Sequence, residues 1–163
     1  MTDTQEIEAK FWAALRSDMT MMLGLQCESY NRTRPMTAQV DGDADRGPIW
    51  FFGSRDSSLV QALSGSHQAT GSFMSKGHHV FATIQGSLKV DNDPAVIDQL
   101  WNPFVAAWYP GGKDDPNLVL LRFDATDAEI WVDGSSFLAG LRMLFGADPR
   151  EDYKDYVAKV SLS

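Results

Sequence analysis

A strict alternation of side chains along residues 80 to 90 limits the folds open to this chain more than any other feature of its sequence. Because successive side chains of a β-strand point to opposite faces, this period of two predicts one long strand with two unlike faces. Gly86 in its middle predicts a bend or bulge, or the close approach of another backbone. One face carries Val80, Ala82, Ile84, Gly86, Leu88 and Val90, and the other carries Phe81, Thr83, Gln85, Ser87 and Lys89.

Shorter apolar runs predict further strands, and three amphipathic stretches predict helices. Strands are expected at residues 21–27, 34–40, 49–53, 69–74, 118–123 and 128–132, the first three forming an antiparallel meander. Helices are expected at residues 3–17, at 54–63 with Ser54 or Asp56 as N-cap, and from Pro94 to about Trp108. Six or seven short strands with few helices indicate a mainly β fold, either a barrel or a sandwich with added helices.

The chain is predicted to form one domain over residues 1–163. A length of 163 residues, with 44% apolar and 22% charged residues, is typical of a single globular domain. The apolar run at 137–145 needs a partner, which is either the protein's own barrel or a second subunit.

The charge balance and the termini restrict the partners. Lysine and arginine number 14 against 22 acidic residues, a net charge of −8, which disfavours nucleic acid and anionic membranes as partners. The acidic, polar start does not resemble a signal peptide, and no apolar run is long enough to span a bilayer. We therefore expect a cytoplasmic protein. The single cysteine, Cys27, excludes an intrachain disulfide.

Motifs that carry catalysis through side chains are missing from the sequence. Neither a metalloprotease H-E-x-x-H nor a G-x-S-x-G nucleophile motif occurs, and the dinucleotide-binding and P-loop glycine patterns are also missing. With His67, His78 and His79 as its histidines, the chain offers no metal-ligand pattern. No catalytic residue and no metal site are assigned, and reactivity borrowed from a bound cofactor fits better.

The strand at 49–53 runs directly into the start of a helix, and this junction is the candidate binding site. A flat heteroaromatic ring would lie along the strand, with its phosphate on the amides and hydroxyls of Ser54, Ser57 and Ser58. Arg34 or Arg55 would add charge-assisted hydrogen bonds. The alternative is that these aromatic residues only fill the protein core.

Several motifs resemble the pyridoxamine 5′-phosphate oxidase-like family of FMN-binding split barrels, and most closely its bacterial general stress protein subfamily. The resemblance covers residues 5 to 134, and the 135–163 extension matches poorly. It is carried by Arg34-Pro-Met36, Ile49-Trp-Phe-Phe-Gly-Ser-Arg-Asp-Ser57, the strand ending in Val90-Asp-Asn-Asp-Pro94, Leu100-Trp-Asn-Pro103, Trp108-Tyr-Pro-Gly-Gly-Lys-Asp-Asp-Pro116, Leu118-Val-Leu-Leu-Arg122 and Ala128-Glu-Ile-Trp131.

This resemblance implies a six-stranded antiparallel split barrel with peripheral helices, forming a homodimer with two FMN sites at the subunit interface. The flavin ring would rest along Trp50, Phe51, Phe52, Gly53 and Ser54, with Met36 beside it. Trp108 to Lys113 would close the site from the other subunit, the alternative being a plain helix end with a turn.

One departure from the family pattern concerns the phosphate. Many relatives carry a lysine after the serine of the strand-to-helix turn, and here that position is Leu59. Either Arg55, Arg34 or Lys76 replaces the missing cation, or the site accepts FAD in place of FMN.

The sequence therefore predicts a flavin-binding general stress protein, with redox activity left open. We expect no pyridoxamine phosphate oxidase activity, because no basic cluster near the C-terminus is suited to a second phosphorylated substrate. The alternatives are a non-catalytic flavin carrier or sensor, and an interaction scaffold without flavin.

Overall fold

The computed structural model describes residues 4–42, 45–132, 144, 146 and 156–163. Nearly all of the predicted apolar run at 137–145 lies outside these residues. The helices are α1 (Thr4–Asp18), α2 (Ser58–Ala62), α3 (Pro94–Leu100) and α4 (Pro103–Trp108), with a 3-10 turn η1 (Gly112–Asp114). The strands are β1 (Thr20–Leu25), β2 (Thr33–Thr37), β3 (Gln39–Val40), β4 (Ile49–Ser54), β5 (His67–Met74), β6 (Val80–Val90), β7 (Leu118–Val132) and β8 (Val157–Ser161).

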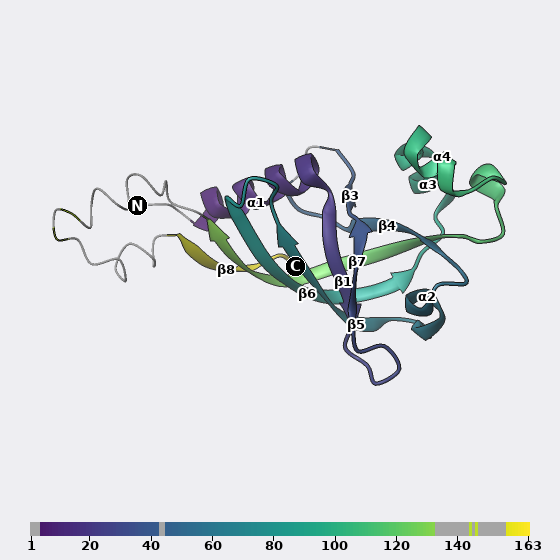
Figure 1. Cartoon of the computed structure of the whole chain (residues 1–163), viewed down its shortest axis with the longest axis horizontal. Helices are drawn as coiled ribbons and strands as arrows, with labels where there is room; N and C mark the ends of the chain where they lie inside the picture. Colours follow the sequence, from purple (N-terminus) through teal and green to yellow (C-terminus); the bar gives the residue numbers. More distant parts are fainter. Residues whose placement is uncertain (1–3, 43–44, 133–143, 145, 147–155) are drawn as a thin grey trace.

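The strands form one antiparallel sheet that curls into a split barrel (Figure 1). Their order is β2-β1-β5-β6-β7-β4-β3, and β8 pairs with the second half of β7. β2 and β3 stand at opposite ends of this order although only Ala38 separates them in sequence. The chain between residues 33 and 40 therefore crosses from one sheet edge to the other, and the predicted mainly β barrel is confirmed.

The structure has eight strands among its described residues, where the apolar runs predicted six or seven and the family resemblance implied six. The predicted strand 34–40 is divided, because residues 33–37 pair with β1 while residues 39 and 40 pair with β4. The meander is confirmed in this divided form. β8 is an addition, and the two predicted strands at 118–123 and 128–132 are one strand, β7.

The long strand β6 has the predicted bounds and the predicted bulge. Its pairing with β7 shifts register between Gln85 and Gly86, where Gly86 lies opposite Ala125. A Cβ atom on Gly86 would meet the carbonyl oxygen of Asp124 and would lie 2.9 Å from the Cα of Ala125. Glycine is required here because two backbones come into contact.

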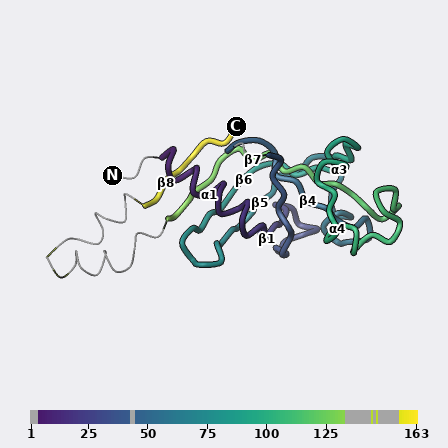
Figure 2. The backbone as a smooth tube through the Cα atoms, turned by 90° about the horizontal axis from the view of Figure 1, so that it is seen from above, coloured from purple at the N-terminus to yellow at the C-terminus, as the bar shows by residue number. Residues whose placement is uncertain are grey.

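Helix α1 supplies much of the main core. Ile7, Phe11, Trp12 and Leu15 are at most 1% exposed and belong to the main core, where α1 contacts β6, β7 and β8. The amphipathic helix expected at residues 3–17 is thus confirmed. Figure 2 shows α1 alongside β6, β7 and β8, away from the end of the molecule that carries α3 and α4.

Two helix predictions are wrong in detail. The helix expected from Pro94 to Trp108 is broken into α3 and α4, because Pro103 cannot continue a helix and Asn102 caps the second one through its Oδ1. Helix α2 begins at Ser58 and is capped by Ser57, whose hydroxyl accepts a hydrogen bond from the Val60 amide at 3.3 Å. Neither Ser54 nor Asp56 is the cap.

A second, smaller core covers the outer face of β4. Trp50 and Phe52 pack there with α3 and α4, whereas Ile49 and Phe51 point into the barrel. This second core comprises Trp50, Ile97, Val105, Tyr109, Leu118 and Leu120, with Phe52, Val96, Leu100 and Trp101 packed against it. Strand β4 is therefore covered by protein on both faces.

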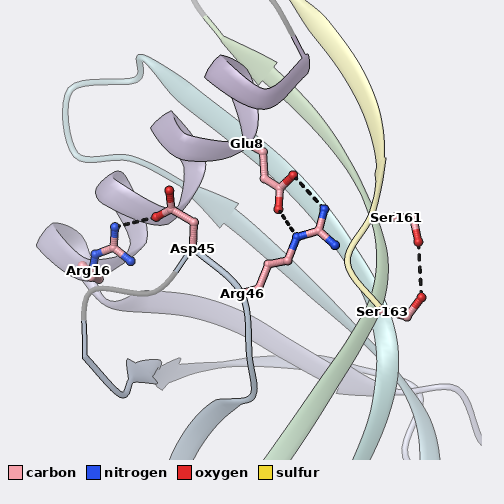
Figure 3. A network of polar contacts seen from close by, with 6 residues as sticks. All are labelled: Glu8, Arg16, Asp45, Arg46, Ser161 and Ser163. Carbon is pink, nitrogen blue, oxygen red and sulfur yellow. Dashed lines mark hydrogen bonds and ion pairs between the residues drawn. The ribbon is translucent and has the colours of Figure 1, made fainter.

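Two ion pairs hold the segment between β3 and β4 against α1 (Figure 3). Glu8 is only 7% exposed; its Oε1 lies 3.2 Å from the Nε of Arg46, and its Oε2 accepts a 3.4 Å hydrogen bond from the Nη2 of Arg46. Arg16 and Asp45 form a more exposed pair at 2.9 Å.

We expect Arg46→Ala to lower the free energy of unfolding by about 1–2 kcal/mol, because it leaves the Glu8 carboxylate buried without its cation. The estimate is below that of a fully buried pair, since the Arg46 side chain is 58% exposed. Chemical denaturation measures the effect. Asp45→Asn is the matched control and is expected to cost less than about 0.5 kcal/mol. Equal losses in the two variants would contradict the assignment, as would a failure of Glu8→Gln to restore stability to Arg46→Ala.

Candidate functional site

Strand β4 does not present a continuous aromatic surface. Alternation places Phe51 in the main core at 0% exposure, and Trp50 lies under α3 and α4 at 5%. Trp50 is further covered by Arg122, whose guanidinium carbon lies 5.6 Å from the ring centroid. Phe52 is partly exposed and packs edge-on against Trp101. Trp50, Phe51 and Phe52 were all predicted to contact the ring. Of these three described residues, Phe52 is the one with a partly exposed side chain.

Gly53 and Leu59 both face the barrel interior. A Cβ on Gly53 would make ordinary contacts with Val60, Val119 and Leu121. Leu59 is 0% exposed within the main core. The Leu59 side chain therefore does not point to the surface of the strand-to-helix turn where a phosphate would lie.

The barrel mouth brings together residues from β2, β4 and the end of α4. Arg34 and Met36 are half-buried, and they pair in register with the core residues Leu23 and Met21. Arg34 acts electrostatically on Tyr109, which also interacts with the hydroxyl of Ser54. These contacts place Arg34, Ser54 and Tyr109 in one cluster beside β4. Among the described residues, no acidic side chain forms an ion pair with Arg34.

Tyr109 is the residue of this cluster that the sequence did not reveal. It is 6% exposed, and its hydroxyl donates a 2.8 Å hydrogen bond to the carbonyl oxygen of Gly53. Burial raises the pKa of Tyr109, and the nearby Asp115 and Asp56 carboxylates raise it further, against the opposing effects of Ser54 and Arg34. The phenol is therefore neutral at physiological pH. In the sequence, Tyr109 stands between a predicted helix and Pro-Gly-Gly. This pattern only weakly indicates a functional tyrosine, because many helix ends have a similar sequence.

Segment 109–117 is hydrogen-bonded to the turn that follows β4. The amide of Arg55 donates to the carbonyl of Asn117 at 2.8 Å, and the amide of Asp56 donates to its Oδ1 at 3.2 Å. The Nε of Arg55 donates to the carbonyl of Pro116 at 2.9 Å. Within the segment, the amides of Asn117 and Gly111 hold the pKa of Asp115 below its ordinary value.

Trp108 and Lys113 lie outside the mouth cluster of a single chain. Trp108 is 81% exposed, and Lys113 forms a 2.9 Å ion pair with Asp98 of α3. Lys76, one candidate replacement for the missing lysine, lies in the turn after β5, at the opposite end of that strand from α2. The exposed positions near the mouth are thus Ser58 and, in part, Phe52, Ser54 and Ser57.

The mouth fits one part of a flavin better than another. The partly exposed Phe52, with the Ser54 hydroxyl, suits a ring and a polyol chain, whereas Met36 packs against the barrel core. The turn suits a terminal phosphate less well, because the amides of Arg55, Asp56 and Ser57 already donate to Asn117 and to the Ser54 carbonyl. Of the amides predicted to bind phosphate, those of Ser54, Ser57 and Ser58, the Ser57 amide already has an acceptor, and phosphate binding by the other two stays a prediction.

Comparison with known proteins shows the family to which the chain belongs. The family model described as "Pyridoxamine 5'-phosphate oxidase like" matches residues 6–151. The chain belongs to this family. The family resemblance in the sequence is thereby confirmed, including its general stress protein branch.

Solved relatives have the same fold. A putative general stress family protein from Xanthomonas campestris pv. campestris is 57% identical, with a TM-score of 0.77 over 83% of this chain and 93% of that one. The general stress FMN/FAD binding protein from Xanthomonas citri is 56% identical, with a TM-score of 0.76 over 81% and 92%. A putative general stress protein 26 from Jannaschia sp. CCS1 is 28% identical, with a TM-score of 0.80 over 98% and 99%.

A shorter match links the chain to General stress protein 26 of Bacillus subtilis (strain 168). It is 29% identical over 63 residues, which is 39% of this chain and 44% of that protein. The match therefore spans less than half of that relative's length. In the part of the chain that the structure describes, none of the helices has the length and apolar character needed to cross a bilayer.

We expect the Tyr109 hydroxyl to stabilise the fold at neutral pH and to lose that effect in alkali. The folded-state pKa lies above the ordinary tyrosine value of 10.0, so the stabilisation is complete below pH 10 and disappears as the pH rises through the folded-state pKa. Tyr109→Phe should lower the free energy of unfolding by about 1 kcal/mol at pH 8, and this difference from the wild type should become smaller at pH 11. Denaturation at the two pH values measures this, with the buried Tyr30→Phe as control. A gap of constant size would count against the proposed bond.

Proposed function

We propose that this protein binds a flavin at the barrel mouth, with FMN as the expected ligand and FAD as the alternative. The observation that carries the proposal is the 56% identity to the Xanthomonas citri general stress FMN/FAD binding protein over 81% of the chain. The half-buried Arg34 supports it, since none of the described acidic side chains pairs with this cation, and a cation in such a place favours an anionic ligand.

In this proposal Met36 and Phe52 contact the ring, Ser54 binds the polyol chain, and Arg34 neutralises the phosphate. Tyr109 holds the end of β4 in place through the Gly53 carbonyl. A bound flavin supplies hydride or electron transfer, and the protein supplies position and electrostatics. Ser57 and Ser58 remain candidates for hydrogen bonds to the flavin from the turn after β4. Trp50, Phe51 and Leu59 are buried, and in this proposal they do not touch the flavin.

We further propose a homodimer whose interface completes each site. An apolar groove of about 770 Å³ crosses the outer face of β1, β5, β6 and β7 and contains Met22, Met74, Phe81 and Trp131. Met74 is 54% exposed, and Phe104 and Trp108 on α4 are 85% and 81% exposed. Exposed apolar area of this kind favours association. Trp108 and Lys113 would then close the site of the partner subunit.

A non-catalytic flavin carrier or sensor is the second candidate. Arg34 and Tyr109 are ionisable groups of the cluster beside β4, and Tyr109 is neutral and donates a hydrogen bond to the Gly53 carbonyl. Neither group suits proton transfer near neutral pH. We retain the expectation that pyridoxamine phosphate oxidation is not its activity, and that the protein is cytoplasmic.

The test is an absorbance spectrum of the purified protein, with release and identification of any chromophore, followed by titration of the flavin-free protein with FMN and FAD. Arg34→Ala should weaken FMN binding at least fivefold while the protein stays folded, and Arg32→Ala is the exposed control. Sedimentation on dilution tests the dimer. Turnover with a reductant and an acceptor separates an enzyme from a carrier. Failure of both flavins to bind at 100 μM would reject the proposal.

A further inference from the structure

We propose that Asn117 is a specificity-determining residue that makes the flavin site nearly indifferent to the terminal group of the flavin. Riboflavin, FMN and FAD would then bind with similar affinity. This inference rests on the proposed function and adds to it which part of the ligand is recognised.

The first step concerns the amides of the turn after β4. Asn117 accepts hydrogen bonds from two of them, through its carbonyl from Arg55 and through its Oδ1 from Asp56. The amide of Ser57 donates to Ser54, and that of Val60 donates to the Ser57 hydroxyl. Four of the six consecutive amides from residue 55 to residue 60 are thereby occupied. Asn117 takes the two donors that an anion at this corner would need first.

The charged side chains around the turn after β4 do not favour a phosphate. Leu59 is buried in the core, and the Nε of Arg55 is turned to the Pro116 carbonyl. The carboxylates of Asp56 and Asp115 both act on Tyr109, so two negative charges lie beside the mouth. They oppose the binding of a phosphate dianion. Arg55 keeps its positive charge, because a carbonyl acceptor does not neutralise a guanidinium, but its side chain is exposed. Among the described residues, the half-buried Arg34 is the cation that acts on Tyr109.

Riboflavin, FMN and FAD differ in the group at the end of the polyol chain. The ring and the polyol chain are common to all three flavins, so their contacts add equally to each affinity. Each charge-assisted hydrogen bond to a phosphate is worth roughly 10- to 150-fold in affinity. A turn with several such bonds would therefore favour FMN over riboflavin by more than 100-fold. With the half-buried Arg34 and the exposed Arg55, both partly in water, we expect a ratio of no more than about tenfold.

The experiment is a fluorescence titration of the flavin-free full chain with riboflavin, FMN and FAD at one ionic strength. Dissociation constants within about tenfold of one another support the inference. Riboflavin binding with FMN more than 100-fold tighter would overturn it and leave the proposed function standing. Binding of none of the three ligands would reject the proposed function itself.

Two variants test the role of Asn117 directly. Asn117→Ala releases the Asp56 amide, so the preference for FMN over riboflavin should rise about fivefold or more. Asn117→Asp keeps the acceptor and adds a negative charge, so this preference should fall, and it serves if the alanine variant does not fold. The exposed Asn31→Ala is the control and should leave the ratio unchanged. An unchanged ratio in the folded Asn117 variants would overturn the assignment.

Discussion

Leu59→Lys is expected to lower the free energy of unfolding by about 3–5 kcal/mol, the cost of placing an uncompensated charge in a core. Leu59 is 0% exposed and lies in the main hydrophobic cluster beside Val60. The family resemblance in the sequence favours the opposite result, since it implies a lysine at this position, and a lysine would attract phosphate. Burial decides between the two expectations, because the ammonium group must first leave water.

Chemical denaturation of Leu59→Lys and Ser58→Lys measures this difference. Ser58 is the neighbouring residue and is exposed, so the same substitution there should change stability by less than about 0.5 kcal/mol. FMN titration of both variants is the second readout. A stable Leu59→Lys protein that binds FMN more tightly than the wild type would show that position 59 reaches the ligand.

Gly86→Ala is expected to cost about 3 kcal/mol, near the upper end for overpacking. The added methyl group would press against the Asp124 carbonyl and the Ala125 Cα, both of which are backbone atoms of the neighbouring strand. Backbone within a ladder has no rotamer to change, so β6 and β7 would have to separate at the bulge. Thermal and chemical denaturation measure the loss.

Gly53→Ala provides the matched glycine control. The nearest atoms to a Cβ at Gly53 are side-chain carbons of Val119, Val60 and Leu121 at 3.4 to 3.6 Å, which are ordinary contacts. We expect a change of less than about 1 kcal/mol. Similar losses at Gly53 and Gly86 would mean that the bulge does not explain the glycine.

The elements with the clearest periodicity could be predicted. The alternation over residues 80–90 gave β6 with its bounds, and the apolar face of residues 3–17 gave α1 within one residue at each end. The break between α3 and α4 could also have been found, because Asn102-Pro103 carries both a cap and a helix-breaking residue. The division of residues 33–40 between two partners could not, because pairing depends on strands distant in sequence.

The candidate site was predictable in part. Arg34 and Ser54, both named from the motifs, act on the same tyrosine, Tyr109, and their contact with a flavin stays a prediction. Tyr109 and Asn117 were missed, because their roles come from hydrogen bonds to Gly53 and Asp56 across more than fifty residues of sequence. No local pattern encodes such contacts.

By itself the sequence determined the class of fold and the family, because strand alternation, turn residues and short motifs are local properties. The tertiary structure decided which side of each strand faces the barrel. It placed Phe51 and Leu59 in the core and put Arg34 beside Ser54 and Tyr109. The physical reason is that burial and charge depend on what lies across the sheet, and those neighbours are set by the closing of the barrel between β2 and β3.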